Sequence, residues 1–222
     1  MKDRVLVVAP HPDDEVLGCG GTLLRLHNEG AELAWLIVTG ISEASGWSTE
    51  RVRERDSEIE RAATALGFTE TFNLRLPAAQ LDIMPMDELI KQCAEIFKSF
   101  KPAVVLLPSL ADAHTDHRIV FDAATACTKW FRSPSVRRVL AYETISETGF
   151  GLGIESRFYP NYFVDISEFL ERKLEIMAIY ESELGDFPFP RSVEAVRALA
   201  TVRGAASGFK AAEAFHLLRE RQ

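Results

Sequence analysis

The chain has 222 residues, of which 47% are hydrophobic and 26% charged, a composition typical of a folded globular protein and not of a disordered or fibrous one. Its 33 acidic and 25 basic residues give a net charge of −8, which argues against a nucleic acid held by a basic surface. No internal repeat or low-complexity linker divides the sequence, so residues 1–222 are expected to form a single domain.

Short apolar runs alternate with longer amphipathic stretches through the first half of the chain. Three of the apolar runs predict buried strands, at 5–8, 33–38 and 103–107. The amphipathic stretches predict helices at about 14–29, 49–66, 86–100 and 117–131. This alternation implies βαβ units, so the expected fold class is α/β, a Rossmann-like three-layer fold with a mostly parallel sheet.

The second half of the chain is less regular. Strands are predicted at 136–142 and 162–165. An amphipathic helix is predicted at 167–184 with Ser167 as its N-cap, and another helix near 192–203.

The three cysteines, Cys19, Cys93 and Cys127, are widely spaced and form no Cys-x-x-Cys pair. This pattern excludes a disulfide framework and a thiolate zinc site, and it suits a reducing compartment. No apolar segment of about 18 residues is present, so no membrane span is predicted and the expected location is the cytoplasm.

Two loops concentrate titratable side chains, and each directly follows an apolar strand. The first reads Pro10-His11-Pro12-Asp13-Asp14-Glu15, and the second contains His114-Thr115-Asp116-His117. In open α/β sheets, ligands bind outside the carboxyl ends of the strands. The two loops are therefore predicted to meet at one site.

The residue types in these loops suit a catalytic metal. His11 and Asp14 are three residues apart, so one helical turn can direct both at one point, and His117 completes a set of two histidines and one carboxylate. Such a set with open positions occurs in catalytic zinc sites and in non-haem iron sites, and residue type alone does not separate them. We expect one divalent ion per chain, Zn²⁺ or another such as Fe²⁺.

The other polar groups of the two loops have chemical roles open to them. Asp13 neighbours a ligand and can take a proton from water, whose pKa a bound metal lowers to about 7. His114 can polarise a substrate carbonyl or protonate a leaving group, and Asp116 can fix the tautomer of an imidazole. For the first loop alone, a polar turn in which Asp14 caps a helix is the competing interpretation.

Together the two motifs resemble those of the PIG-L/LmbE-like family of N-acetylglucosamine deacetylases, zinc enzymes with a Rossmann-like fold. The resemblance implies a role for each polar residue: zinc binding by His11, Asp14 and His117, general base catalysis by Asp13, oxyanion stabilisation by His114, and orientation of that histidine by Asp116.

More distant segments agree with this resemblance. Arg55-x-x-Glu58 is similar to the family's second helix, whose arginine reaches the active site, which implies that Arg55 contacts the substrate. The residues alone are equally compatible with a solvated charged face. Arg203-Gly204 and the segment 212–215 resemble the family's C-terminal signature. One departure is Pro77-Ala78-Ala79, where many members have Pro-Asp-Gly, so the usual aspartate contact to the substrate is missing.

The expected function is metal-dependent hydrolysis of the amide of an N-acetylated amino sugar, alone or as a glycoconjugate, to acetate and a free amine. A ferrous oxygenase with the same three ligands is one alternative. A non-catalytic sugar- or nucleotide-binding module is another, although a pure binder has no use for Asp13 beside the metal. The aromatic segments 158–162 and 187–190 suit either a lid or a contact between copies, which leaves a homo-oligomer open.

Overall fold

The computed structural model describes residues 3–152 and 157–222. Within them, seven strands form one sheet: β1 (Arg4–Ala9), β2 (Glu32–Gly40), β3 (Glu70–Pro77), β4 (Val104–Leu107), β5 (Arg138–Tyr142), β6 (Tyr162–Asp165) and β7 (Ala212–Glu220). Their order is β3-β2-β1-β4-β5-β7-β6, with β1 to β5 parallel and β7 antiparallel to both β5 and β6. The predicted α/β fold with a mostly parallel sheet is confirmed.

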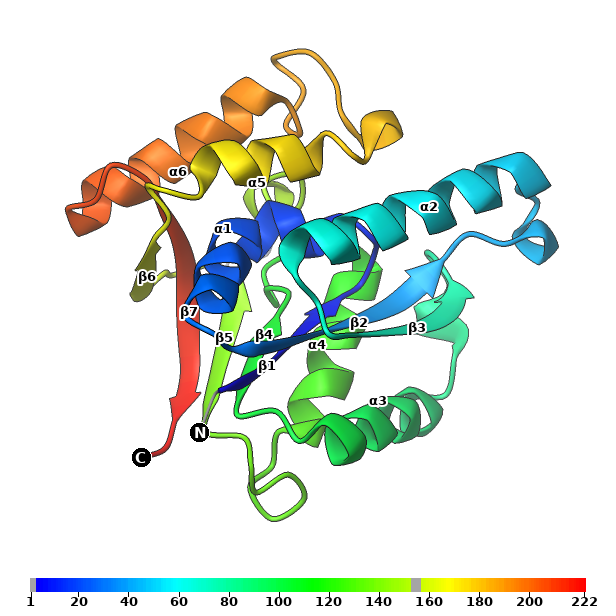
Figure 1. Cartoon of the computed structure of the whole chain (residues 1–222). Helices are drawn as coiled ribbons and strands as arrows, with labels where there is room; N and C mark the ends of the chain where they lie inside the picture. The colour runs from blue at the N-terminus through cyan, green and yellow to red at the C-terminus, as the bar shows by residue number, and fades with distance from the viewer. Residues whose placement is uncertain (1–2, 153–156) are drawn as a thin grey trace.

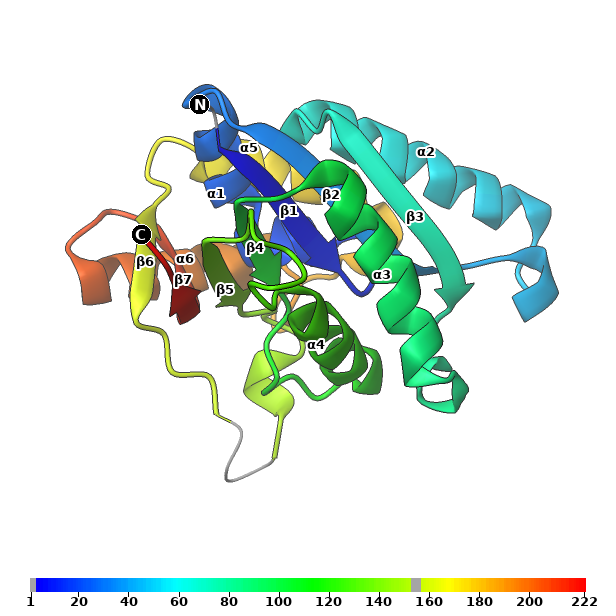
Figure 2. The same ribbon diagram turned by 90° about the horizontal axis from the view of Figure 1, so that it is seen from below.

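Helices cover both faces of the sheet and give the molecule three layers (Figures 1 and 2). One face carries α1 (Asp14–Asn28), α2 (Thr49–Leu66), α5 (Leu170–Met177) and α6 (Val193–Ser207). The other face carries α3 (Met86–Phe100) and α4 (Thr115–Cys127). None of the helices described is long and apolar enough to cross a membrane.

Strand β1 shows why the central strands are apolar without alternation. Val5 and Val7 pack into the core under α1, whereas Leu6 and Val8 pack into the core under α3 and α4. All four side chains are fully buried because helices cover both faces. The end of β1 is thus fixed between two cores, and the first polar loop leaves from a rigid position.

Helix α1 bends at Cys19, whose backbone is not helical, and a carboxylate from the far end of the chain stabilises the bend. Glu213 of β7 accepts the N–H groups of Gly21 at 2.9 Å and Thr22 at 2.7 Å, which the bend leaves without helical partners. The ammonium of Lys173 neutralises this buried carboxylate at 2.7 Å. Part of the predicted C-terminal signature therefore acts as an internal helix cap.

Three predicted helices have the wrong limits, among them the helix predicted near 192–203, which is α6 and ends at Ser207. Two strands were not predicted. The helix predicted at 117–131 is α4, Thr115–Cys127. The helix predicted at 167–184 is reduced to α5, and Ser167 is not its N-cap, because its hydroxyl hydrogen-bonds with Asp165 and Ala211 instead. The unpredicted strands are β3, an edge strand with many exposed polar residues, and β7, whose second half is exposed.

Candidate metal centre and active-site pocket

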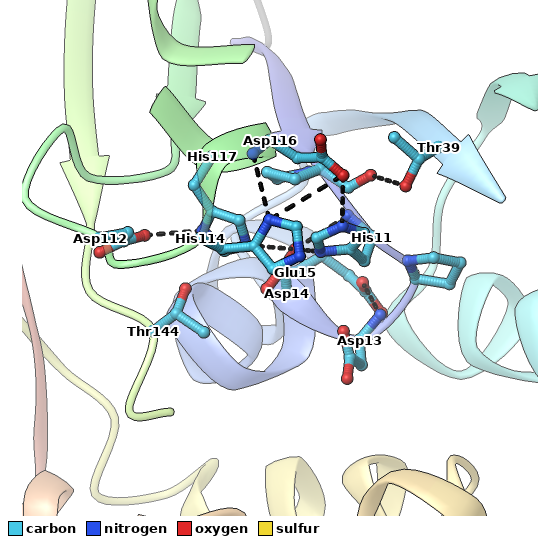
Figure 3. A network of polar contacts seen from close by, with 12 residues as sticks. His11, Asp13, Asp14, Glu15, Thr39, Asp112, His114, Asp116, His117 and Thr144 are labelled. Atoms are coloured by element: carbon cyan, nitrogen blue, oxygen red, sulfur yellow. Dashed lines mark hydrogen bonds and ion pairs between the residues drawn. The ribbon is translucent and has the colours of Figure 1, made fainter. Parts of the chain in front are cut away.

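The two polar loops meet at the carboxyl edge of the sheet, as the sequence predicts. They line a cavity of about 270 Å³, to which the loop after β2, helix α2 and the segments around residues 146–147 and 183–191 also contribute. Figure 3 shows the histidines of both loops directed toward one another. Their ring centroids lie 4.6 Å apart for His11 and His114 and 5.3 Å apart for His11 and His117.

His11, Asp14 and His117 offer three ligand atoms to one point. The Asp14 Oδ2 atom lies 3.4 Å from His11 Nδ1 and 3.3 Å from His117 Nε2, and the three donors lie within 4.8 Å of one another. Asp14 is the first residue of α1, and its Oδ2 atom accepts the His11 N–H at 2.8 Å. The local turn therefore directs both side chains of the first loop to the same place.

The imidazoles of His11 and His117 each contact a further carboxylate through the ring nitrogen that does not face Asp14. His11 Nε2 lies 3.0 Å from Asp116 Oδ2, and His117 Nδ1 lies 2.7 Å from Asp112 Oδ2. A carboxylate on the second ring nitrogen fixes the tautomer and leaves the other nitrogen free for a metal. Sequence reasoning assigned no role to Asp112, although its position five residues before His117 in the same loop was a signal.

A second group of potential ligands, His11, His114 and Asp116, overlaps the first. Asp116 Oδ2 already accepts the Ala79 N–H at 2.7 Å and faces the His11 ring nitrogen at hydrogen-bond distance. His114 Nδ1 accepts the Asp116 N–H at 3.1 Å. These donors are engaged with one another, so the geometry favours the group that contains Asp14 and His117.

The electrostatics of the group formed by His11, Asp14 and His117 favour a bound positive charge. Burial lowers the pKa of His11, but hydrogen bonds to Asp116 and Asp14 outweigh it and raise that pKa to about 9. Burial also lowers the pKa of His117, but Asp14 and Asp112 raise it well above its ordinary value. The pKa of Asp14 is held well below its usual range because the two histidines outweigh the effect of burial. A divalent cation would supply the charge that protons otherwise supply.

His114 is arranged as a neutral hydrogen-bond donor. It is the N-cap of α4, and because its Nδ1 accepts the Asp116 N–H, the proton of the neutral ring sits on Nε2. Burial and the neighbouring His11 lower the pKa of His114. The Asp116 carboxylate lies closer to His11, with its Oδ2 atom 3.0 Å from His11 Nε2 and 3.9 Å from His114 Nδ1, and the Asp116 backbone N–H donates to His114. The implied orientation of His114 by Asp116 stays a prediction.

Asp13 is held in an unusual backbone conformation beside the ligands. Its φ of 126° lies in the left-handed region, and its N–H donates to Glu15 Oε2 at 3.0 Å. The other Glu15 oxygen accepts the Tyr180 hydroxyl at 2.9 Å, so the buried Glu15 ties the loop to the segment after α5. Sequence reasoning missed this role of Glu15.

The Asp13 carboxylate itself is buried among other acidic groups. Burial, followed by the charges of Asp14 and Glu183, raises the pKa of Asp13 to about 8. Within the described part of the chain, its one ion pair is a distant contact with Arg191 Nη1 at 3.9 Å. The carboxylate therefore remains available to exchange a proton in the cavity.

Arg55 lines the cavity, but it is nearly buried and already has partners. Its guanidinium donates to the Pro12 carbonyl at 3.1 Å and pairs with Glu58 at 3.1 Å and with Glu183. These contacts hold the first loop in place; contact with a substrate stays a prediction.

The segment Pro77-Ala78-Ala79 lacks the aspartate that many family members have there, and it lies beside the cavity. Ala78 lines the cavity, and the N–H of Ala79 binds Asp116. Tyr142 and Glu143, at the end of β5, do not line this cavity: Tyr142 donates to the Val8 carbonyl, and Glu143 pairs with Arg203.

Comparison with known proteins gives consistent results. A family model described as PIG-L, GlcNAc-PI de-N-acetylase, matches residues 6–128, more than half of the chain. Diacetylchitobiose deacetylase of Thermococcus kodakarensis is 28% identical over 225 residues, which cover 95% of this chain and 81% of that protein. The conserved protein TT1542 from Thermus thermophilus is 31% identical, with a TM-score of 0.80 over 100% of this chain and 97% of that chain.

The same fold also carries a different activity. GalB, the 4-carboxy-2-hydroxymuconate hydratase from Pseudomonas putida KT2440, has a TM-score of 0.76 over 100% of this chain and 98% of its own, at 18% identity. At that identity the likeness concerns the fold alone. The function must therefore be argued from the side chains of the site.

Proposed function

The chain belongs to the PIG-L family, and on that premise we propose that it is a metal-dependent de-N-acetylase that hydrolyses the amide of an N-acetylated amino sugar to acetate and a free amine. The name of the Thermococcus kodakarensis relative supports an N-acetylglucosamine-type substrate. We also propose that residues 1–222 act as one domain, because β7 pairs with β5 from the first 142 residues and with β6.

The observation that carries this proposal is the separation of two kinds of polar group in one cavity. Three donors, on His11, Asp14 and His117, converge within 4.8 Å, as a metal requires. Asp13 and His114 line the same cavity without belonging to that set. Amide hydrolysis needs both kinds, a Lewis acid and separate groups that move protons and stabilise charge.

We assign zinc to the site because two imidazoles and one carboxylate are a common set in catalytic zinc centres. When bound, the metal would polarise the acetyl carbonyl and lower the pKa of water to about 7. Asp116 and Asp112 hold the two imidazoles with the ligand nitrogens free, as the 3.0 Å and 2.7 Å contacts indicate.

The remaining residues account for the proton transfers. Asp13 accepts a proton from the water that attacks the acetyl carbon and holds it until the proton is given back. The Nε2–H of His114 donates to the carbonyl oxygen as negative charge develops there. When the C–N bond breaks, the proton on Asp13 passes to the sugar nitrogen, so that acetate and the free amine leave.

Metal content and acetate release test the proposal together. His117→Ala is expected to abolish both, because it removes one of three ligands, whereas His216→Ala on β7, outside the cavity, should retain both. Full metal occupancy in His117→Ala would show that the ligand assignment is wrong.

The two alternatives give different products. A ferrous oxygenase consumes O₂ and needs a redox metal, so acetate release by the zinc-loaded protein without O₂ consumption excludes it. A binding module retains the sugar but releases no acetate from it. Reconstitution of metal-free protein with Zn²⁺ and, without oxygen, with Fe²⁺ identifies the metal that supports turnover.

A further inference from the structure

Trp47 is an aromatic surface at the opening of the cavity. Among the described residues that line the cavity, it is the one tryptophan, tyrosine or phenylalanine. It is 48% exposed, whereas Asp14 and His117 are 3% and 1% exposed. This difference in exposure places Asp14 and His117 at the bottom of the cavity and Trp47 at its mouth.

The volume of the cavity limits what fits inside. About 270 Å³ is below the range of roughly 300–1,000 Å³ for pockets that enclose a drug-sized ligand. One acetamido sugar ring can occupy this space with its acetyl group near His11 and His117. Whatever is attached to that ring must pass the opening, where Trp47 lies.

The loop that carries Trp47 is fixed before any ligand arrives. Ser42 and Ser45 form a reciprocal capping box, and the Trp47 N–H donates to the Ser42 carbonyl at 3.3 Å. The next residue, Ser48, caps helix α2 through the N–H of Arg51 at 3.1 Å. A side chain on such a loop loses little conformational entropy on binding.

The charges around the opening are already paired. Arg51 pairs with Glu54 and Glu58, at 3.1 and 3.5 Å. Arg55 and Arg191 both pair with Glu183. Among the described residues that line the cavity, all three arginines thus have carboxylate partners, so a carboxylate or phosphate on the substrate would meet no arginine whose charge is unbalanced.

We propose that Trp47 forms an outer subsite on which a second, uncharged sugar ring stacks, so that the preferred substrate is a neutral glycoside of the N-acetylated amino sugar. The C–H face of a pyranose is complementary to the negative face of an indole ring. This inference rests on the proposed function for the identity of the inner ring, and it assigns Trp47 as a specificity residue.

Binding of one ring and of two rings to the metal-loaded protein, in an Asp13→Asn background in which hydrolysis is slow, separates this subsite from the inner site. By calorimetry, Trp47→Ala should weaken N,N′-diacetylchitobiose about tenfold, whereas the affinity for N-acetylglucosamine should stay within about twofold. Trp47→Phe, which keeps an aromatic face, should recover part of the loss. Trp130→Ala is the matched control, because Trp130 is 62% exposed but lies outside the cavity, in the connection between α4 and β5.

A charged ligand provides the second comparison. N-acetylglucosamine 1-phosphate should bind more weakly than the uncharged methyl glycoside. Tighter binding of the phosphate, equal effects of Trp47→Ala on one ring and two, or the absence of disaccharide binding to the protein that keeps Trp47 would overturn the inference. Acetate release is scored separately: a disaccharide that binds through Trp47 but yields no acetate contradicts the proposed function and leaves the outer subsite intact.

Discussion

Replacement of Asp13 by asparagine separates proton transfer from metal binding. Asparagine has nearly the same shape and, like aspartate, tolerates a positive φ such as the 126° of residue 13. The backbone N–H of residue 13 can still donate to Glu15. The metal donors on His11, Asp14 and His117 are unchanged, so the variant is expected to bind the metal normally.

The effect of Asp13→Asn on turnover follows from the chemistry of the asparagine side chain. Asparagine cannot accept the proton of the attacking water, and loss of a general base costs about 10²–10⁴-fold in rate. The affinity for substrate should change little, because Asp13 is assigned to the proton and not to the sugar. The expected result is a large decrease in kcat at nearly constant KM.

The same substitution should stabilise the metal-free protein. Folding raises the pKa of Asp13 from 3.8 to about 8, so the ionised carboxylate opposes folding once the pH exceeds about 4, and the penalty is complete above about pH 8. Each pH unit within this window is worth about 1.4 kcal/mol, which amounts to a few kcal/mol at neutral pH. Asp13→Asn removes this penalty, and its advantage over the wild type should grow from pH 5 to pH 8.

Three measurements test this reasoning: metal content by mass spectrometry, acetate release, and urea unfolding of the metal-free protein at pH 5 and pH 8. Asp82→Asn is a control, since Asp82 is exposed and lies outside the cavity. Loss of metal from Asp13→Asn, or near wild-type turnover with metal bound, would show that the base is elsewhere. A stability advantage that shrinks with rising pH would contradict the burial of a charged carboxylate.

Three further outcomes are expected. Asp112→Asn should lower metal affinity about 10–100-fold without loss of the fold, as measured by competition with a chelator, because Asp112 holds the His117 ring at 2.7 Å. Metal binding at pH 7 should release about two protons, because the pKa values of His11 and His117 are raised and both rings must be neutral to bind. Calorimetry in buffers of different ionisation enthalpy counts the released protons, and release of fewer than one proton contradicts the assignment. Gly18→Ala should destabilise the protein by about 1–3 kcal/mol in urea unfolding, because its Cβ would lie 2.2 Å from the Tyr142 ring.

The sequence predicted the part of the site that depends on local order. His11 and Asp14 are three residues apart on a turn that leaves a buried strand, and the alternation of strands and helices was enough to predict that His117 would meet them at the carboxyl edge. Such an inference requires only the periodicity of the chain and the rule that parallel strands share an edge.

The parts that were not predicted depend on contacts between distant residues. The apolar period of the segment 167–184 continues to Ile179, but α5 ends at Met177 and the chain turns so that the Tyr180 hydroxyl reaches Glu15, 165 positions away. The hydrogen-bond distances from the Asp116 carboxylate to His11 and to the N–H of Ala79 were not predicted either. Periodicity carries no information on which distant carboxylate faces which imidazole.

The division of labour within the chain explains why the second half matters to a site whose polar loops lie in the first. Asp14 sits at the start of α1, and that helix is capped after its bend by Glu213 of β7. The turn at Asp13 is held by Glu15, whose partner Tyr180 follows α5. A strained turn persists only where surrounding contacts over-determine it. The loops of the first half supply the chemistry, and the C-terminal strand and helices fix the positions in which that chemistry can occur.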